Sequence, residues 1–581
     1  MANMIQAAKD SANDILQAAY RRAAEKGQLP AGAELSGTVE IPKDTANGDF
    51  AANHAMTGAR ALRMAPRKIA EVLIENAELA GSWFSSLEAA GPGFLNFRLA
   101  ETWYADVLGA IRSEGQDYGR LDEGRGQRVM VEFVSANPTG PMHMGNARGG
   151  VLGDALASVL DRAGYDVWRE FYVNDAGNQI EKFASSIDAR YRQLILGEDA
   201  VAFPEDGYQG DDIRELAAAF RAENGDAFLE KDVAERHEAM AAFGLKHNIP
   251  KMQSDLKRYG IEYDQWFFES QLHESGYVAD SVQKLTERGY TYEKDGALWL
   301  ATSRILGENL KKQGKTDEEI EKLELKDDVL RRANGFYTYF AADIAYHRNK
   351  LAERGFDKAI NVWGADHHGH VARLKGALDA LGLDGEHRLD IVLMQLVKLT
   401  RNGEVVRMSK RTGKAISLTD LLDEIPVDAA RYFFNSRPES AVEFDLELAV
   451  RQDSENPVYY VQYAHARCKS ILKALAAEGI SGDPKDPDLT LLTDPAELDL
   501  IRQLSKLPEE IRLAADSRDP SRLNRYAAEC ATAFHHFYTV CRIKEAATPA
   551  LRDARICLVN CMAQVVRNTL STLGVNAPDH M

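Results

Sequence analysis

Three patterns of apolar and polar positions follow one another in the middle of this 581-residue chain. Residues 129–134 form a short, mainly apolar run rich in β-branched residues, which is typical of a buried strand. Apolar residues then recur at helical spacing between 151 and 160, and residues 166–173 again have the pattern of a strand. A polar loop with Gly and Pro lies between the first strand and the helix. This order predicts a parallel α/β domain of the Rossmann type.

The patterns on either side predict further domains. Residues 1–115 contain helical spacing over 4–25 and 66–79 and strand-like runs over 37–42 and 91–99, which predicts a small α+β domain. A polar, Gly-rich linker follows. Residues 195–290 are charged and mostly helical in pattern, so we interpret them as an insertion into the α/β domain of residues 116–420. A single strand is expected over 391–399. The last domain, residues 421–581, is predicted to be all-helical.

Composition narrows the class of protein. The chain is 45% hydrophobic and 27% charged and has no apolar run long enough to span a bilayer, so we expect a cytoplasmic protein without membrane contact. Its five cysteines lack a Cys-x-x-Cys pair, which favours buried free thiols over disulfides or zinc. The net charge of −19 argues mildly against nucleic acid. An RNA partner would have to be bound through local basic patches, stacking and shape.

Two polar segments are suited to binding a polyphosphate. The loop after the first strand holds Pro138, Gly140, His143, Gly145 and Asn146. A helix N-terminus there offers free N–H groups and a partial positive charge. The second segment, residues 407–414, carries four cations and suits a mobile loop that grips phosphates. A solvated surface or a weak RNA patch is the alternative for this segment.

Other segments suggest a pocket for a small molecule. Tyr339 and Asp343 are four residues apart and share one helix face, where a buried carboxylate would suit a guanidinium. On pattern alone, the better interpretation is an Asp on the helix surface beside a packed Tyr, with no binding role. The turn at 174–175 lines a site or caps a helix, and the pattern does not decide between them. The histidines after the strand at 362 suggest a metal, but their spacing fits no zinc pattern.

These segments resemble a known family. His-Met-Gly-Asn at 143–146 and Arg-Met-Ser-Lys at 407–410 resemble the His-Ile-Gly-His and Lys-Met-Ser-Lys signatures of class I aminoacyl-tRNA synthetases. Residues 132–141 and 456–467, with Asp-Ala-Ala-Arg at 428–431, are similar to arginyl-tRNA synthetases in particular. The resemblance covers nearly the whole chain. One departure is that Asn146 stands where the family has its second histidine, and asparagine cannot carry a proton.

The resemblance implies an arginine–tRNA ligase that takes ATP with Mg²⁺, L-arginine and tRNA(Arg). We also expect no DNA partner, no resident metal and a monomer. Glu132, Asp343 and Tyr339 would read the guanidinium, and Ser135 and Asn137 would hold the α-amino end. Catalysis would use His143, Asn146, Lys410 and Arg407. The remaining roles implied are ATP binding by Pro138, Gly140, His143, Gly145, Asn146, Asp366, His367, Met408, Ser409 and Lys410, and tRNA binding by Tyr459, Gln462, Tyr463 and Arg467.

Two alternatives stay open at this point. Because Asn146 replaces a histidine, the chain could be a paralogue that binds tRNA or arginine without charging. The presence of Lys410, Tyr339 and Asp343 argues against this. It could also be a class I synthetase for glutamate, glutamine or cysteine, which the paired carboxylates and the segment Tyr459–Arg467 disfavour.

Overall fold

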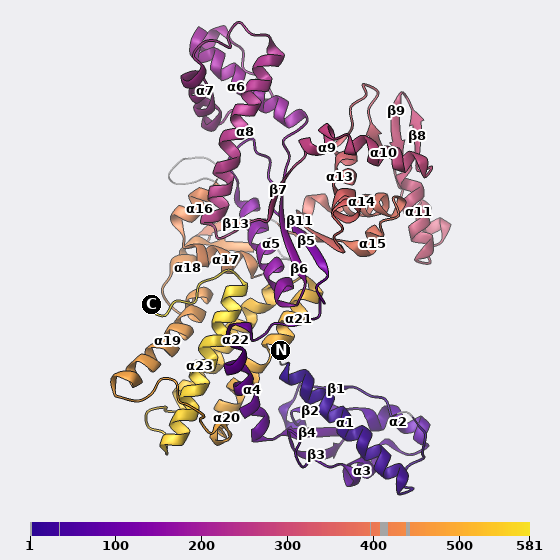
Figure 1. Cartoon of the computed structure of the whole chain (residues 1–581), viewed down its shortest axis with the longest axis vertical. Coiled ribbons are helices and arrows are strands. Elements are labelled where there is room, and N and C mark those ends of the chain that lie inside the picture. The colour runs from indigo at the N-terminus through magenta and orange to yellow at the C-terminus, as the bar shows by residue number, and fades with distance from the viewer. Residues whose placement is uncertain (1–2, 34, 396, 407–415, 437–441) are drawn as a thin grey trace.

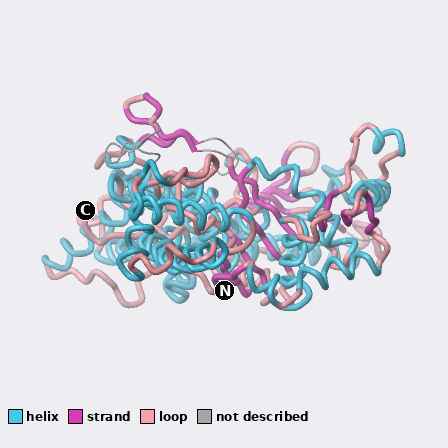
Figure 2. The backbone as a smooth tube through the Cα atoms, turned by 90° about the horizontal axis from the view of Figure 1, so that it is seen from above, coloured by secondary structure: helices cyan, strands magenta, loops and turns pink. Residues whose placement is uncertain are grey.

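A five-stranded parallel sheet forms the centre of the molecule. The computed structural model describes residues 3–33, 35–395, 397–406, 416–436 and 442–581. The strand order is β12-β11-β5-β6-β7, with every neighbouring pair parallel. The strands are β5 (Arg128–Glu132), β6 (Asp166–Val173), β7 (Gln265–Phe268), β11 (Lys358–Gly364) and β12 (Leu389–Met394). Helices flank the strands in the view of Figure 2. Val129 and Val131 are almost fully buried, as expected for a parallel sheet covered on both faces.

The N-terminal part forms a separate layer at one end of the molecule, in indigo in Figure 1. Its antiparallel sheet has the order β1-β2-β4-β3 and is covered by three helices. These elements are α1 (Met4–Glu25), β1 (Val39–Glu40), β2 (Phe50–Ala52), α2 (His54–Leu62), α3 (Pro66–Asn76), β3 (Phe84–Ala90) and β4 (Phe94–Leu99). The α+β pattern predicted for this region is therefore found. α4 (Glu101–Glu114) leaves this layer and packs on the C-terminal helices.

The chain leaves the central sheet twice. After β6, the helices α6 (Asn178–Leu196), α7 (Asp211–Asn224) and α8 (Val233–Arg258) form a helical unit around their own apolar cluster at the end opposite the N-terminal layer (Figure 1). β7 then returns the chain to the sheet. It lies within residues 195–290, for which the sequence predicts a mostly helical insertion. The second excursion contains α9 (Ser270–Glu274), α10 (Tyr277–Glu287), β8 (Thr291–Lys294), β9 (Ala297–Leu300), α11 (Thr302–Lys312), α12 (Asp317–Glu321) and β10 (Asp328–Arg331).

The chain returns to the central sheet through α13 (Tyr339–Arg348) and β11. The helices α14 (His368–Ala380) and α15 (Gly385–Arg388) follow β11. The single strand expected over 391–399 is divided. β12 ends at Met394 in the central sheet, whereas β13 (Val397–Arg401) pairs with β14 (Glu404–Val405) and β15 (Val442–Asp445) in another sheet. A run of apolar residues does not reveal where a chain changes its pairing partner.

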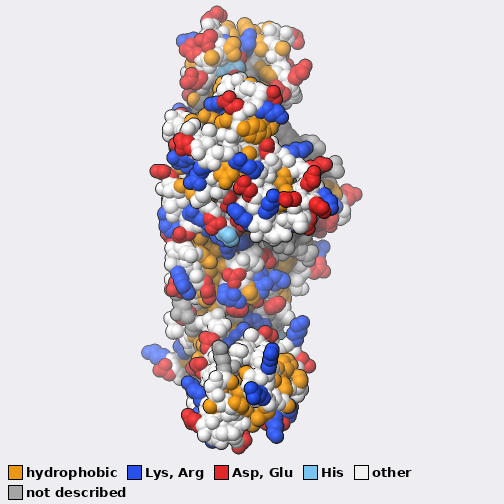
Figure 3. Space-filling view, turned by 90° about the vertical axis from the view of Figure 1, so that its right-hand side faces the viewer, with side chains coloured by type: hydrophobic (Ala, Val, Ile, Leu, Met, Phe, Trp, Pro, Cys, Tyr) orange, Lys and Arg blue, Asp and Glu red, His pale blue; other side chains and the backbone are white. Residues whose placement is uncertain are grey.

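The C-terminal region is a helical bundle, as predicted, although one short strand of residues 421–581, β15, pairs with β13 outside the bundle. Its elements are α16 (Leu418–Glu424), α17 (Val427–Asn435), α18 (Leu446–Val450), α19 (Pro457–Ala477), α20 (Pro495–Ser505), α21 (Leu507–Ser517), α22 (Ser521–Val540) and α23 (Pro549–Thr572). The five cysteines are buried free thiols. Acidic and basic side chains are interspersed on the face seen in Figure 3. None of the helices in the described part of the chain is long and apolar enough to cross a membrane.

Candidate active site

A cavity of about 800 Å³ lies at the carboxyl ends of the central strands. The chain leaves β5 toward β6 on one side and comes back to β11 on the other, so this is a topological switch point, where open α/β sheets bind ligands. Its lining comes from the ends of four strands, from α13 and α14, and from the start of α6. The lining residues used below are Ser135, Asn137, Tyr172, Asn174, Glu269, Tyr339, Asp343, Asp366, His367 and His370.

The structure brings together four of the five residues predicted to hold the amino acid. Ser135 and Asn137 follow β5, and Tyr339 and Asp343 lie on one turn of α13. Asp343 Oδ2 accepts a hydrogen bond from His370 Nε2 at 2.6 Å. Burial is the largest influence on the pKa of Asp343 and raises it, but the hydrogen bond from His370 and the charges of His347, His370 and Lys350 together outweigh burial, so the pKa is lowered. The cavity wall therefore carries an ionised carboxylate beside an aromatic side chain.

Glu132, the fifth of these residues, lies behind the cavity wall rather than on it. Its Oε2 accepts from Lys350 Nζ at 2.5 Å and its Oε1 accepts from Ser135 Oγ at 2.9 Å. Only 5% of the residue is exposed. Burial raises the pKa of Glu132, and the Lys350 ammonium opposes this rise. Both carboxylate oxygens are thus engaged by the protein's own groups.

Glu269 is a second carboxylate on the wall, and the sequence reasoning assigned it no role. It follows β7 directly and is 3% exposed. In its better-satisfied orientation the Asn174 amide donates to Glu269 Oε2 at 3.1 Å. Burial and the Glu269 carboxylate raise the pKa of Tyr172. A signal was present, since a charged residue directly after the apolar run 266–268 falls at a strand's carboxyl end.

The turn at 174–175 is a part of this wall and does not cap α6, the helix that follows it. Gly177 is the N-cap residue of α6 and provides no side-chain cap. Asn174 lines the cavity. Asp175 accepts from the backbone N–H of Ser270 at 2.9 Å and from its hydroxyl at 2.7 Å, so it fixes the start of α9 next to Glu269.

His143 and Asn146 cap α5 (Met144–Arg162) at the edge of the sheet. Asn146 Oδ1 accepts from the His143 N–H at 3.0 Å, and His143 Nδ1 accepts from the Gly145 N–H at 3.2 Å. A Cβ on Gly145 would lie 3.1 Å from the His143 ring, so the glycine leaves room for the imidazole. Burial lowers the pKa of His143, which keeps the ring neutral.

The loop before α5 is held by two distant parts of the chain. Asn248 of α8 donates to the Pro138 carbonyl at 2.8 Å, and a Cβ on Gly140 would lie 3.4 Å from the Asp212 carboxylate of α7. Leu418 donates its N–H to the Met142 carbonyl at 2.9 Å. Ser417 forms a β-bridge with His143. Arg407, Met408, Ser409 and Lys410 lie outside the described residues, whereas Ser417 and Leu418 lie against the loop that carries His143.

Asp366 and His367 are exposed and lie at the rim, where β11 gives way to α14. The His367 ring lies 5.7 Å from the Trp363 ring. In the part of the chain that the structure describes, no three His, Cys, Asp or Glu side chains gather as a metal site. The histidines here bind protein groups instead, as His370 binds Asp343.

A second cluster of predicted residues lies on α19 and α22 of the bundle. The rings of Tyr459, Tyr463 and His535 stack in a row, with centroid distances of 6.1 Å for each neighbouring pair. The Arg467 guanidinium lies 5.0 Å from the centre of the Tyr538 ring. The rings of Tyr459, Tyr463 and His535 line a surface cavity. Gln462 differs, because it is buried and its amide nitrogen donates to Asp428 at 2.8 Å and to the Asn576 carbonyl at 2.9 Å.

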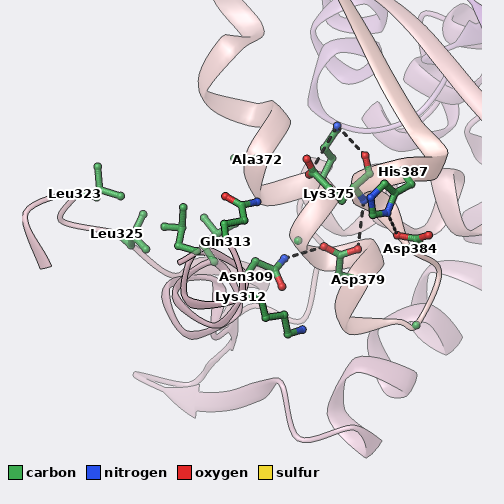
Figure 4. A pocket seen from close by; sticks show the side chains of 15 residues that line it. Asn309, Lys312, Gln313, Leu323, Leu325, Ala372, Lys375, Asp379, Asp384 and His387 are labelled. Atoms are coloured by element: carbon green, nitrogen blue, oxygen red, sulfur yellow. Dashed lines mark hydrogen bonds and ion pairs between the residues drawn. The ribbon is translucent and has the colours of Figure 1, made fainter. Parts of the chain in front are cut away.

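Another cavity, of about 910 Å³, lies between α11, α14 and α15 (Figure 4). Its polar groups are paired with one another. Asn309 donates to Asp379 at 2.7 Å, His387 binds Asp384 at 2.6 Å, and Lys375 donates to the Glu386 carbonyl at 3.3 Å. No strand of the central sheet ends in its lining, whereas four strand ends meet at the first cavity.

Comparison with protein families agrees with this architecture. Residues 9–99 match the family described as arginyl tRNA synthetase N terminal domain, and residues 461–581 match the DALR anticodon binding domain. Residues 108–450 match the catalytic domain of tRNA synthetases class I (R). The fold and the site are those of a class I aminoacyl-tRNA synthetase.

Relatives and solved structures narrow the class. The chain is 50% identical to the arginine–tRNA ligase of Acetivibrio thermocellus and 51% identical to that of Caldanaerobacter subterraneus subsp. tengcongensis, with 100% of both chains covered in each case. The Thermus thermophilus arginyl-tRNA synthetase shares the fold, with a TM-score of 0.72 at 21% identity over 98% of this chain and 100% of that one. The chain therefore belongs to the arginyl-tRNA synthetase family, as its sequence predicted.

Proposed function

We propose that this protein is an arginine–tRNA ligase, which uses ATP to form arginyl-adenylate and transfers the arginyl group to the 3′ end of tRNA(Arg). One observation carries the proposal. The cavity at the switch point carries two carboxylates, Asp343 and Glu269, whose ion pairs in the described part of the chain are with histidines only. A cationic side chain that enters the cavity would supply the missing charge, and a guanidinium fits a carboxylate with two hydrogen bonds.

The remaining residues around the cavity fit the other parts of arginine. Ser135 and Asn137 are assigned to the α-amino end, and Tyr339 closes the guanidinium side. The paired carboxylates disfavour glutamate as a substrate, since a third negative charge would be repelled. Glutamine and cysteine would leave the carboxylates unpaired, which is costly in a buried site. The residues named here extend the predicted set by Glu269.

The chemistry needs no side-chain nucleophile. The carboxylate oxygen of arginine attacks the α-phosphorus of ATP, and the bond to the pyrophosphate oxygen breaks. A ribose hydroxyl of the tRNA then attacks the acyl carbon and AMP leaves. The protein contributes positioning and stabilisation of developing phosphate charge. The N–H groups at the start of α5, with His143, are assigned to the phosphates. Lys410 and Arg407 are assigned to the departing pyrophosphate.

Three further assignments follow from this activity. Mg²⁺ is expected to arrive with ATP, held mainly by the phosphates, because magnesium usually binds one or two carboxylates plus substrate phosphates. The aromatic row of Tyr459, Tyr463 and His535, with Arg467, is assigned to unpaired tRNA bases. We expect the enzyme to act as a monomer in the cytoplasm.

A charging assay tests the proposal. The purified chain is incubated with ATP, Mg²⁺, total tRNA and each of the twenty amino acids in turn. We expect labelled arginine alone to become acid-precipitable with tRNA. Charging of glutamate, glutamine or cysteine would assign another substrate, and binding of tRNA and arginine without charging would identify a non-charging paralogue.

A further inference from the structure

We propose that Lys350 is a positioning residue that acts through Glu132 on the part of the site that holds the α-amino end of the amino acid. The inference rests on the proposed function, because it concerns how arginine is bound. Under this proposal Glu132 does not contact the guanidinium directly, in contrast to the role that the sequence analysis gave it. The geometry of one buried ion pair and of one strained turn carries it.

Lys350 joins three elements that surround the cavity. It lies in a π-helical turn (Asn349–Glu353) that directly continues α13, and its side chain is fully buried. π-helical turns are rare and frequent at functional sites. The ammonium donates to Glu132 Oε2 of β5 at 2.5 Å and to Asn361 Oδ1 of β11 at 3.2 Å, and it lies 4.1 Å from the centre of the Tyr346 ring.

Glu132 connects the Lys350 ammonium to a strained turn at residues 134–135. Its second oxygen accepts from Ser135 Oγ, and the same hydroxyl accepts from the Tyr172 N–H at 3.2 Å. Val134 and Ser135 have φ angles of 70° and 44°. A left-handed conformation is rare for a β-branched residue, and strain of this kind persists only where surrounding contacts hold it. Here the contacts that hold the turn are the hydrogen bonds of Ser135 with Glu132 and with the Tyr172 N–H.

The turn presents Ser135 and Asn137 to the cavity, whereas Lys350 and Glu132 are absent from its lining. Glu132 therefore has both oxygens engaged and no face toward a ligand. Asp343 and Glu269 remain as the carboxylates on the wall. Loss of the Lys350 charge would leave a buried carboxylate without a cation, and relaxation of the turn is the expected response.

Three variants test the relay: Lys350→Met, Glu132→Gln and the two combined. Arginine KM in aminoacylation is measured at saturating ATP and tRNA, and ATP KM at saturating arginine. Each single substitution leaves one buried charge unpaired, so arginine KM should rise at least about tenfold with ATP KM within about twofold. The double variant removes both charges and should recover most of the loss. Lys358→Met, which removes a partly exposed lysine of β11 paired with Asp390, is the matched control and should change neither KM.

A ligand without the α-amino group separates the relay from guanidinium reading. 5-Guanidinopentanoate is used as a competitive inhibitor against arginine. Its Ki should stay within about twofold in Lys350→Met and in the double variant, and should rise at least about tenfold in Asp343→Asn. A double variant no better than Glu132→Gln, with a raised inhibitor Ki, would mean that Glu132 reads the guanidinium and would overturn the proposal.

Unchanged arginine KM in both single variants would also overturn it. If the single variants fail to fold, the double variant alone still decides. If Lys350 acts through Glu132, the arginine KM and inhibitor Ki of this variant should lie near the parent values. If Glu132 reads the guanidinium, both should be raised. Failure of the proposed function is a separate outcome, since the unaltered chain would then not charge arginine at all.

Discussion

At the scale of single residues, Asn146 has an observed role in the fold and a proposed role in the chemistry. Its Oδ1 caps the His143 N–H, which belongs to the reciprocal cap at the start of α5. This contact needs only a hydrogen-bond acceptor at the third residue of the helix, as in a capping box. The amide nitrogen takes no part in the cap and can donate to a phosphate.

Substitution at Asn146 separates these two roles. Asn146→Ala should lose the cap, at a cost of about 1 kcal/mol in stability, and should also lower kcat. Asn146→Asp keeps an acceptor for the cap but adds a negative charge beside the phosphates, so stability should hold while kcat falls by more than in the alanine variant. Equal kcat in both variants, measured by single-turnover charging, would show that Asn146 acts through the cap alone. Asn146→His reports whether the family's usual histidine raises activity.

His347 gives the fold a defined dependence on pH. It is fully buried, its Nδ1 lies 2.8 Å from the Asp343 carbonyl, and its Nε2 lies 2.8 Å from the Asn361 amide nitrogen. Burial, followed by the Lys350 charge, lowers its pKa to about 3. The unfolded chain takes up this proton near pH 6.5 and the folded chain does not. Stability from this group is therefore complete above pH 6.5 and declines as the pH falls toward 3.

The comparison of the parent with His347→Gln tests this. Between pH 7 and pH 5 the parent should lose roughly 2 kcal/mol more of unfolding free energy than the variant. Denaturant titrations at several pH values give the difference. His387 is the control of opposite sign, since its exposed ring binds Asp384 and its pKa is raised. Its stabilising effect is present at low pH and lost as the pH rises, so His387→Gln should show the reverse trend.

At the scale of elements, one buried arginine ties the bundle to the catalytic sheet. Arg431 of α17 donates to Asp154 of α5 at 2.5 Å, to the carbonyls of Tyr259 and Gly260, and to the Leu573 carbonyl at the end of α23, the last three at 3.2 Å. A Cβ on Gly574 would lie 1.9 Å from its guanidinium, and φ there is 65°. Only glycine fits that position. The Asp-Ala-Ala-Arg segment thus holds four parts of the chain together.

Arg431→Met should lower the free energy of unfolding by about 3–5 kcal/mol, because Asp154 and three carbonyls lose a buried donor. Arg431→Lys should recover little, since an ammonium lacks the planar fork that reaches several acceptors. The denaturant midpoint gives the measurement. Arg512→Met on α21 is the control, because its pairs with Glu509 and Asp516 are partly exposed and should contribute about 1 kcal/mol or less. Equal effects of the two methionine variants would contradict the role given to Arg431.

The elements also show what the sequence could predict. Amphipathic spacing located α1, α3 and α5, and the resemblance to a known family placed Ser135, Asn137, Tyr339 and Asp343 in one region. Patterns failed where the outcome depends on a distant partner. The division of β12 from β13 depends on which sheet each half joins. The engagement of Glu132 by Lys350 depends on two residues 218 positions apart.

At the scale of the whole molecule, the acidic composition and an RNA substrate have to be reconciled. The net charge is −19, and both signs are interspersed on the surface of Figure 3. A long-range basic field is therefore not the source of affinity for tRNA. The aromatic row on α19 and α22 offers a source that does not depend on net charge, since every base has a face that can stack.

Tyr463→Ala should therefore raise the KM for tRNA about 5- to 150-fold, because stacking of a base on an aromatic ring contributes ~1–3 kcal/mol. Arginine and ATP KM at saturating tRNA should stay near the parent values, as the aromatic row is remote from the central cavity. The slope of log tRNA affinity against log salt should be the same in the parent and in Tyr463→Ala, because the substitution removes no cation, whereas Arg467→Met should make it shallower. Filter binding at several salt concentrations measures both. A salt slope that changes with Tyr463 but not with Arg467 would contradict the division of roles between stacking and charge.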